Sequence, residues 1–232
     1  MKPPERLAIF DLDYTLTRKG TWGRFVAICM RGRGWRWPEL ALRAGLAQAL
    51  YKLGLLPRIA VKTQMMRVCM VGRTREELTR LAEGFAAAEV PDRLRPGGIA
   101  ALERHREAGD RLMIASAAVD LIVAPIARRL GVEDWVATEF AWDAEGRLAD
   151  HFRSPNCYGP RKKEAVERFY GGLKPSDTVI TIYSDSSADI DLFTLAHHPM
   201  AVNPSSKLRS LAHERGWPVL DWNESSGRDA ST

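Results

Sequence analysis

Short apolar runs recur along this chain, and each is followed directly by an acid or a hydroxyl. The three cases are LAIF (7–10) before Asp11 and Asp13, LMIA (112–115) before Ser116, and VITIYS (179–184) before Asp185 and Asp189. In an open parallel sheet the carboxyl ends of the strands face one crevice. We therefore expect these scattered polar side chains to converge at one edge of a sheet.

From residue 92 onward, strand-like and helix-like patterns alternate. The predicted strands are 111–116, 134–142, 177–185 and 199–204, the last taken as the final core strand, with helices between them and a hairpin turn at 144–150. Alternation of this kind predicts a doubly wound, Rossmann-like α/β fold with a mostly parallel sheet.

Residues 22–90 instead carry helical spacing without strand-like alternation. Breaks are expected at Gly32–Gly34, Pro57, Gly72 and Pro91. We predict an all-helical cap at 18–90 inserted into a core of 1–17 and 91–222. The polar residues 223–232 are expected to be a disordered tail.

Composition is that of a soluble globular protein, with 45% hydrophobic and 27% charged residues. The first apolar run is too short for a signal peptide, and no window approaches the ~20 apolar residues of a membrane span. Cys29, Cys69 and Cys157 lie far apart, which favours reduced thiols over a disulfide framework or a zinc cluster. A cytoplasmic location is expected.

Carboxylates that converge at one point repel each other unless a cation lies among them, and hard oxygen ligands suit Mg²⁺. A carboxylate beside Mg²⁺ can attack phosphorus to form an aspartyl-phosphate, while a second acid transfers the proton. A lysine and a hydroxyl would hold the remaining phosphate oxygens. The stretch GPRKKEAV (159–166) offers the lysine.

These motifs carry a family resemblance over nearly the whole chain. DLDYTLT (11–17) resembles the DxDxT signature of the haloacid dehalogenase (HAD) superfamily, ASAAVD (115–120) its second motif, and YSDSSADIDLF (183–193) its acidic fourth motif. A helical insert straight after the first motif is similar to subfamily IB, which includes phosphoserine phosphatase. The resemblance implies the HAD fold and phosphate chemistry.

The resemblance also implies a role for each residue. Asp11 would be the nucleophile and Asp13 the general acid/base, and Mg²⁺ would be bound by Asp11, the Asp13 backbone carbonyl and Asp185, with Asp189 in support. Phosphate binding is expected of Ser116, Lys162 and Thr15, the last also holding the first loop. Lys162 is preferred to Lys163 because family spacing places an aliphatic residue, here Val166, four positions later.

Two positions depart from the family pattern. Ala188 stands where the fourth motif usually has Asn, so some support for the metal-binding acid is lost or comes from elsewhere. Gly20 stands where phosphoserine phosphatases have a Glu that pairs with the substrate ammonium. Phosphoserine is therefore disfavoured as substrate, although an acid elsewhere in the cap would leave histidinol phosphate open.

The segment 18–75 holds thirteen basic residues and one acid, Glu39. Arginines at helical spacing are typical of a solvated face; a cap that attracts anionic substrates is the functional alternative. WRWPELALRAGLAQALYKLGLL (35–56) also resembles an interfacial helix, so weak membrane-surface contact stays open. No nucleic-acid recognition motif is present, and no nucleic-acid partner is expected.

The sequence thus predicts a Mg²⁺-dependent phosphomonoester phosphatase acting on a small anionic ester. Three alternatives remain: a phosphotransferase using the same intermediate, a phospholipid-head-group phosphatase, and a non-catalytic anion-binding module. The physiological substrate and the oligomeric state are not specified by the sequence.

Overall fold

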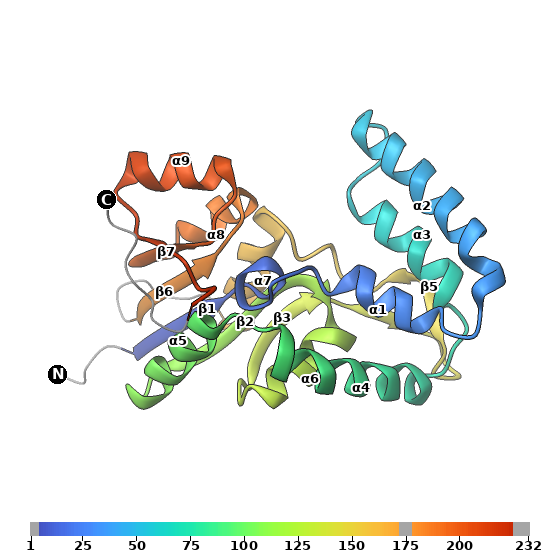
Figure 1. The fold of residues 1–232 in the computed structure, drawn as a ribbon, viewed down its shortest axis with the longest axis horizontal. Helices are drawn as coiled ribbons and strands as arrows, with labels where there is room; N and C mark the ends of the chain where they lie inside the picture. Colours follow the sequence, from blue (N-terminus) through green and yellow to red (C-terminus); the bar gives the residue numbers. More distant parts are fainter. Residues whose placement is uncertain (1–4, 172–177, 225–232) are drawn as a thin grey trace.

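A six-stranded parallel sheet forms the centre of the molecule, in the order β3-β2-β1-β6-β7-β8 (Figure 1). The computed structural model describes residues 5–171 and 178–224. The strands are β1 (Glu5–Phe10), β2 (Arg111–Val119), β3 (Asp134–Thr138), β6 (Thr178–Ser184), β7 (His198–Val202) and β8 (Val219–Leu220). The strand order reverses at β1, which confirms the predicted doubly wound α/β fold.

Both faces of the sheet are buried under helices, because successive side chains of a strand point to opposite faces. Ala8 and Phe10 of β1 join one apolar cluster, while Leu7 and Ile9 join the other. The first cluster is covered by α5 (Pro96–Glu107) and α6 (Asp120–Arg129), and the second by α7 (Pro160–Phe169), α8 (Ile190–Phe193) and α9 (Ser206–Arg215).

The segment 22–93, between the turn after β1 and α5, is helical, as its spacing predicts. It forms α1 (Trp22–Cys29), a 3₁₀ turn (Gly34–Arg36), α2 (Trp37–Lys52), α3 (Ile59–Cys69) and α4 (Arg75–Arg93). In Figure 1, α2 and α3 pack against each other and stand clear of the sheet, whereas α4 lies beside α6. The Thr74 side chain caps α4 by accepting a hydrogen bond from the Glu77 backbone N–H.

The stretch 134–142 is not one strand. It divides into β3, within the main sheet, and β4 (Phe140–Trp142), which pairs antiparallel with β5 (Leu148–Phe152). The chain leaves the sheet at Glu139, whose N–H donates to the Ser154 hydroxyl instead of a neighbouring strand. Gly146, at φ +70°, makes the expected turn between β4 and β5.

Two other expectations are wrong. Pro91 does not end a helix, because α4 continues to Arg93; a proline this close to the end removes only one backbone hydrogen bond, and buried side chains anchor the helix. Strand 199–204 is not the last, since the two-residue β8 follows and pairs with β7. Two residues are too few for periodicity to reveal. Most of the predicted tail, 225–232, lies outside the described residues.

A close contact between α5 and the end of the described chain closes the core. Trp222 is buried against Phe10 and Tyr183 and lies on Gly97 and Gly98. A Cβ at Gly97 would lie 2.6 Å from Trp222 Cδ1 and 2.8 Å from Trp222 Cα. Because one of these atoms is backbone, the contact cannot be relieved by a rotamer change.

We expect Gly97→Ala to lower the free energy of unfolding by about 1–3 kcal/mol through overpacking. The matched control is Gly84→Ala within α4, where an added Cβ meets no atom within 4 Å. This control should raise stability by up to about 1 kcal/mol, because alanine favours helix. Urea unfolding measures both, and a Gly97→Ala variant as stable as the control would contradict the close packing.

Candidate active site

The site begins where β1 ends. Phe10 is the last residue of the strand, and residues 12–16 form a tight turn in which Tyr14 has φ +66°. Asp11 and Thr15 are buried, and Asp13 is half-buried in the same turn. The turn therefore holds two carboxylates at the carboxyl end of a central strand, as the sequence predicts.

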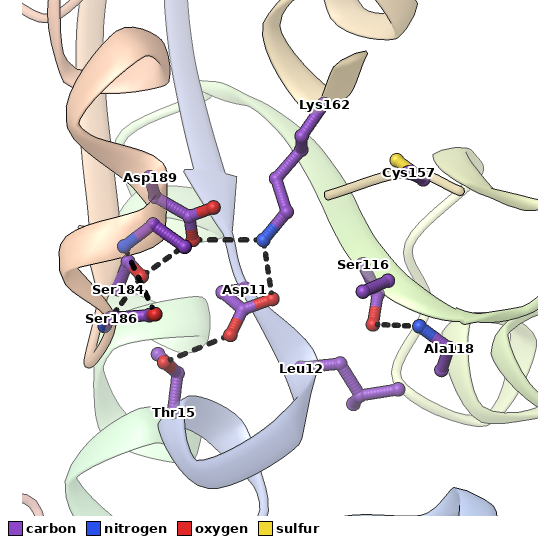
Figure 2. Close-up of polar contacts among 12 residues, drawn as sticks. Asp11, Leu12, Thr15, Ser116, Ala118, Cys157, Lys162, Ser184, Ser186 and Asp189 are labelled. Carbon is purple, nitrogen blue, oxygen red and sulfur yellow. Dashed lines mark hydrogen bonds and ion pairs between the residues drawn. The ribbon is translucent and has the colours of Figure 1, made fainter. Parts of the chain in front are cut away.

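A buried lysine joins the first and last acids of the predicted set (Figure 2). Lys162 Nζ, from the first turn of α7, donates to Asp11 Oδ1 at 2.9 Å and to Asp189 Oδ2 at 2.8 Å. Lys163 instead donates to Thr194 near the surface. Of the two candidate lysines, the structure brings Lys162 to Asp11.

Ser184 also holds Asp189, and the sequence analysis did not identify it. Its hydroxyl donates to Asp189 Oδ2 at 2.6 Å and accepts from the Ser186 N–H at 3.1 Å. Ser184 is the last residue of β6 and is fully buried. Its place directly before Asp185, at the end of an apolar run, was the signal that could have identified it.

Thr15 ties the first turn to the loop after β6. Its hydroxyl lies 3.3 Å from Asp11 Oδ2 and 3.2 Å from Asp185 Oδ1, and it accepts the Asp185 N–H at 2.9 Å. The single hydroxyl hydrogen serves one carboxylate at a time. Asp11 and Asp185 are thus held close together, 174 positions apart in the chain.

Burial and crowding shape the electrostatics of these acids. Burial raises the pKa of Asp11 to about 8; Lys162 opposes this effect, and Asp189 and Asp185 reinforce it. Burial likewise raises the pKa of Asp185 to about 6, against the hydrogen bond from Thr15. For Lys162, burial would lower the pKa, but Asp11 and Asp189 outweigh it and raise the pKa. The cluster holds more negative charge than one lysine neutralises.

Asp13 lies apart from this cluster. Asp13 Oδ1 accepts the Thr21 backbone N–H at 2.8 Å, and burial raises the Asp13 pKa despite that hydrogen bond. Asp13 also lines a cavity of about 350 Å³ between α2, α3 and the C-terminal end of β2. Its raised pKa suits a group that must take up and release a proton.

Two cations, Lys62 of α3 and Arg58 directly before it, line the same cavity. Lys62 Nζ donates to the Ala117 carbonyl at 2.6 Å and to Asn156 Oδ1 at 3.0 Å, while Arg58 donates to the Tyr158 hydroxyl at 2.9 Å. Burial lowers the Lys62 pKa to about 8, against the attraction of Asp13. Sequence reasoning did not single out Lys62 or Arg58 among the many basic residues of this segment.

Ser116 is buried within β2, and its hydroxyl accepts the Ala118 N–H at 3.0 Å. Figure 2 shows Ser116 on the strand beside Asp11, without a bond to Lys162 or the acids. The structure therefore brings Ser116 to the same sheet edge but not into hydrogen-bond contact with the cluster.

The carboxylates of Asp11, Asp185 and Asp189 are the side chains of this site that could bind Mg²⁺. Among residues 5–171 and 178–224, no three His, Cys, Asp or Glu side chains form a ready metal cluster. Magnesium, however, often takes one or two carboxylates and completes its shell with water and phosphate. Asp11 and Asp185 fit that smaller set, and Asp189 Oδ1 is buried without a hydrogen-bond partner in the part of the chain that the structure describes.

The chain is similar to several known proteins. Residues 8–194 match the family described as haloacid dehalogenase-like hydrolase. Protein CicA of Caulobacter vibrioides is 30% identical, covering 82% of each chain. Histidinol-phosphatase of Neisseria meningitidis serogroup C is 25% identical and covers 94% of this chain and 99% of its own. A Bordetella pertussis Tohama I protein of unknown function has a crystal structure with TM-score 0.82 and 28% identity, covering 93% and 98%.

The Asp11 pKa predicts a pH-dependent effect of Asp11→Asn in metal-free protein. Because the folded-state pKa is raised, the stability linked to Asp11 is fully present below about pH 4 and is lost as pH rises through about 8. The neutral Asn avoids this loss. We expect Asp11→Asn to match the wild type near pH 4 and to exceed its stability at pH 8, by on the order of 3 kcal/mol.

Urea unfolding in EDTA at several pH values measures this difference. The control is Asp191→Asn, an exposed acid on α8, which should follow the wild type throughout. A stability difference for Asp11→Asn that did not grow with pH would contradict the assigned burial of Asp11.

Proposed function

The chain belongs to the haloacid dehalogenase-like hydrolases and is an enzyme of the phosphatase type, and from this premise we propose that it hydrolyses phosphomonoesters through an aspartyl-phosphate on Asp11. The observation that carries the proposal is the pairing of buried Asp11 with Lys162, beside a cavity lined by Asp13. A carboxylate, a cation and a separate acid are the groups that the reaction requires.

Asp11 is the nucleophile. Lys162 favours the anionic form of Asp11, and only the anion attacks phosphorus. A carboxylate oxygen of Asp11 forms the new P–O bond while the bond to the ester oxygen breaks. Lys162 and the Ser116 hydroxyl would bind the phosphate oxygens, and Thr15, whose hydroxyl lies 3.3 Å from Asp11 Oδ2, would keep the turn in place.

Asp13 transfers the proton. Its protonated form gives the proton to the departing alkoxide, and the resulting carboxylate takes a proton from the water that cleaves the aspartyl-phosphate. The products are the alcohol and inorganic phosphate, and Asp13 ends protonated, as it began. The Thr21 N–H holds the Asp13 side chain on the cavity side of the turn.

Mg²⁺ is the metal that we assign to the site. Asp11, Asp185 and the Asp13 backbone carbonyl would hold it, and Asp189, fixed by Lys162 and Ser184, would support the shell. When bound, Mg²⁺ would balance the negative charge of these carboxylates and of the phosphate group, which Lys162 alone does not neutralise. Ser184 takes over support that the family pattern assigns to the residue at position 188.

The helical segment 18–90 acts as a cap, and its α2–α3 pair sets the substrate class. The cavity is lined by Gln48 and Tyr51 of α2, by Lys62 of α3 and by Arg58 directly before α3. An added anionic group on the alcohol part of the ester would face two cations. An ammonium group there would instead meet these two cations, and among the residues that line the cavity Asp13, which the reaction uses, is the one acid. Gly20, which lies against the Tyr14 ring, carries no side chain that could pair with the ammonium.

The experiment is phosphate release from matched esters, with Mg²⁺ or EDTA. 3-Phosphoglycerate and O-phosphoserine both carry a carboxylate, but only phosphoserine carries an ammonium. We expect kcat/KM to be at least about tenfold higher for 3-phosphoglycerate, because an unpaired ammonium beside Arg58 and Lys62 costs more than ~1.4 kcal/mol. EDTA and Asp11→Asn should each abolish release, while Asp191→Asn should retain it. Release that persists in Asp11→Asn would overturn the assigned nucleophile.

The role of Asp13 can be tested by comparing an ester whose leaving group needs a proton with one whose leaving group does not. p-Nitrophenolate departs without a proton, whereas an alkoxide requires one. We expect Asp13→Asn to lower kcat by roughly 10²–10⁴ on 3-phosphoglycerate but by much less on formation of the aspartyl-phosphate from p-nitrophenyl phosphate. Burst amplitudes of p-nitrophenolate isolate that first step. An equal loss of rate with both esters would contradict proton transfer by Asp13.

A further inference from the structure

The helix α2 is apolar on two opposite sides, and only one of them is covered. Leu40 and Ala47 are buried against the rest of the protein, whereas Leu42, Leu46 and Leu53 are 72%, 59% and 71% exposed. The three exposed leucines are spaced by four and seven residues, which places them on one stripe of the helix. We call this stripe the outer face of α2.

Two further large apolar side chains lie exposed just beyond the ends of the helix. Trp35, just before the N-terminal end, is 78% exposed, and Leu55, just beyond the C-terminal end, is 67% exposed. Single exposed apolar residues are ordinary on protein surfaces, but a continuous set of large ones marks an interaction site. Tryptophan in particular favours the boundary between water and hydrocarbon.

The same segment is strongly basic. Residues 31–58 contain six arginines and lysines and one acid, Glu39. Glu39 is already paired, since Arg36 contacts it at 2.9 Å and Arg43 at 3.1 Å. Arg31 and Lys52 are exposed, and neither forms an ion pair with any of the residues described. An apolar stripe with cations on both flanks is complementary to a surface that is apolar inside and anionic outside.

We propose that the outer face of α2 docks on the surface of a membrane rich in anionic phospholipid. A second copy of the chain fits poorly, because a symmetric contact would bring two sets of these cations together. A lipid surface supplies both contributions to the free energy of binding. The leucines are buried among the lipid chains, and each basic residue near anionic headgroups adds about 1 kcal/mol.

The position of α2 in the fold permits this docking. The α2–α3 pair stands clear of the sheet (Figure 1), so the outer face can lie on a flat surface while the sheet remains in water. Gln48 and Tyr51, which line the cavity with Asp13, lie on the opposite side of α2. None of the described helices is long and apolar enough to cross a bilayer, so the contact would be peripheral. The proposal does not depend on the phosphatase reaction.

The experiment is co-sedimentation of the full chain with vesicles of phosphatidylglycerol and phosphatidylcholine, compared with phosphatidylcholine alone. We expect binding to the mixed vesicles that falls with added salt. The pair Leu42→Gln and Leu46→Gln should weaken it on the order of a hundredfold through lost apolar burial. The matched control is Phe169→Gln, which changes an exposed apolar residue on α7.

A second pair of variants tests the charges without altering the apolar stripe. Arg31→Gln with Lys52→Gln should weaken binding to mixed vesicles roughly 30-fold. Lys207→Gln with Arg209→Gln, on exposed positions of α9, leaves the outer face untouched and should bind as the wild type does.

Two results would overturn the proposal. One is the absence of binding to the anionic vesicles at low salt. The other is a dimer in light scattering that the Leu42 and Leu46 substitutions dissociate, which would assign the outer face to a second copy. Thermal melting of each variant confirms that the fold is retained, so loss of structure is not mistaken for loss of binding.

Discussion

The contact of Lys162 with Asp11 and Asp189 is the interaction on which the site depends. A buried ammonium is tolerated only with anionic partners, and two buried carboxylates are tolerated only with a cation. Because the three residues come from β1, α7 and the turn after β6, the mutual requirement fixes these elements relative to one another. Thr15 adds Asp185 to the same arrangement. Removing Lys162 would leave two buried carboxylates without a cation, so the position of this one lysine decides whether the acids can be held together.

The parts of this structure that the sequence predicted are those governed by local pattern. The apolar run before Asp11 predicted both the central strand and the position of the acid at its end. The choice of Lys162 over Lys163 came instead from the spacing of the family that the chain resembles, and helix geometry explains why that spacing succeeds. Residues four apart share one face of a helix, and Lys162 and the core residue Val166 are both buried, whereas Lys163 is turned outward.

The parts that the sequence did not predict depend on contacts between distant segments. Lys62 resembles a dozen other basic residues until α3 places it beside Ala117 and Asn156. The division of 134–142 between two sheets depends on Ser154, which no periodicity indicates. Ser184 could have been recognised from the sequence, because it lies at the carboxyl end of a strand, next to Asp185, as the predicted acids do. Whether a basic helix faces water, substrate or lipid is likewise a matter of its neighbours rather than of its own spacing.

The central position of β1 has a consequence for the order in which the chain folds during synthesis. β1 comprises residues 5–10, but its partners are β2, at 111–119, and β6, at 178–184. β1 therefore leaves the ribosome well before β2 and waits longer still for β6, whereas α2 and α3 can associate as neighbours soon after they are made. Asp11 meets Lys162 and Asp189 only after those two residues have also been synthesised. The growing chain thus carries an apolar strand with one edge unpaired until β6 is made, and the groups of the site come together only at that late stage.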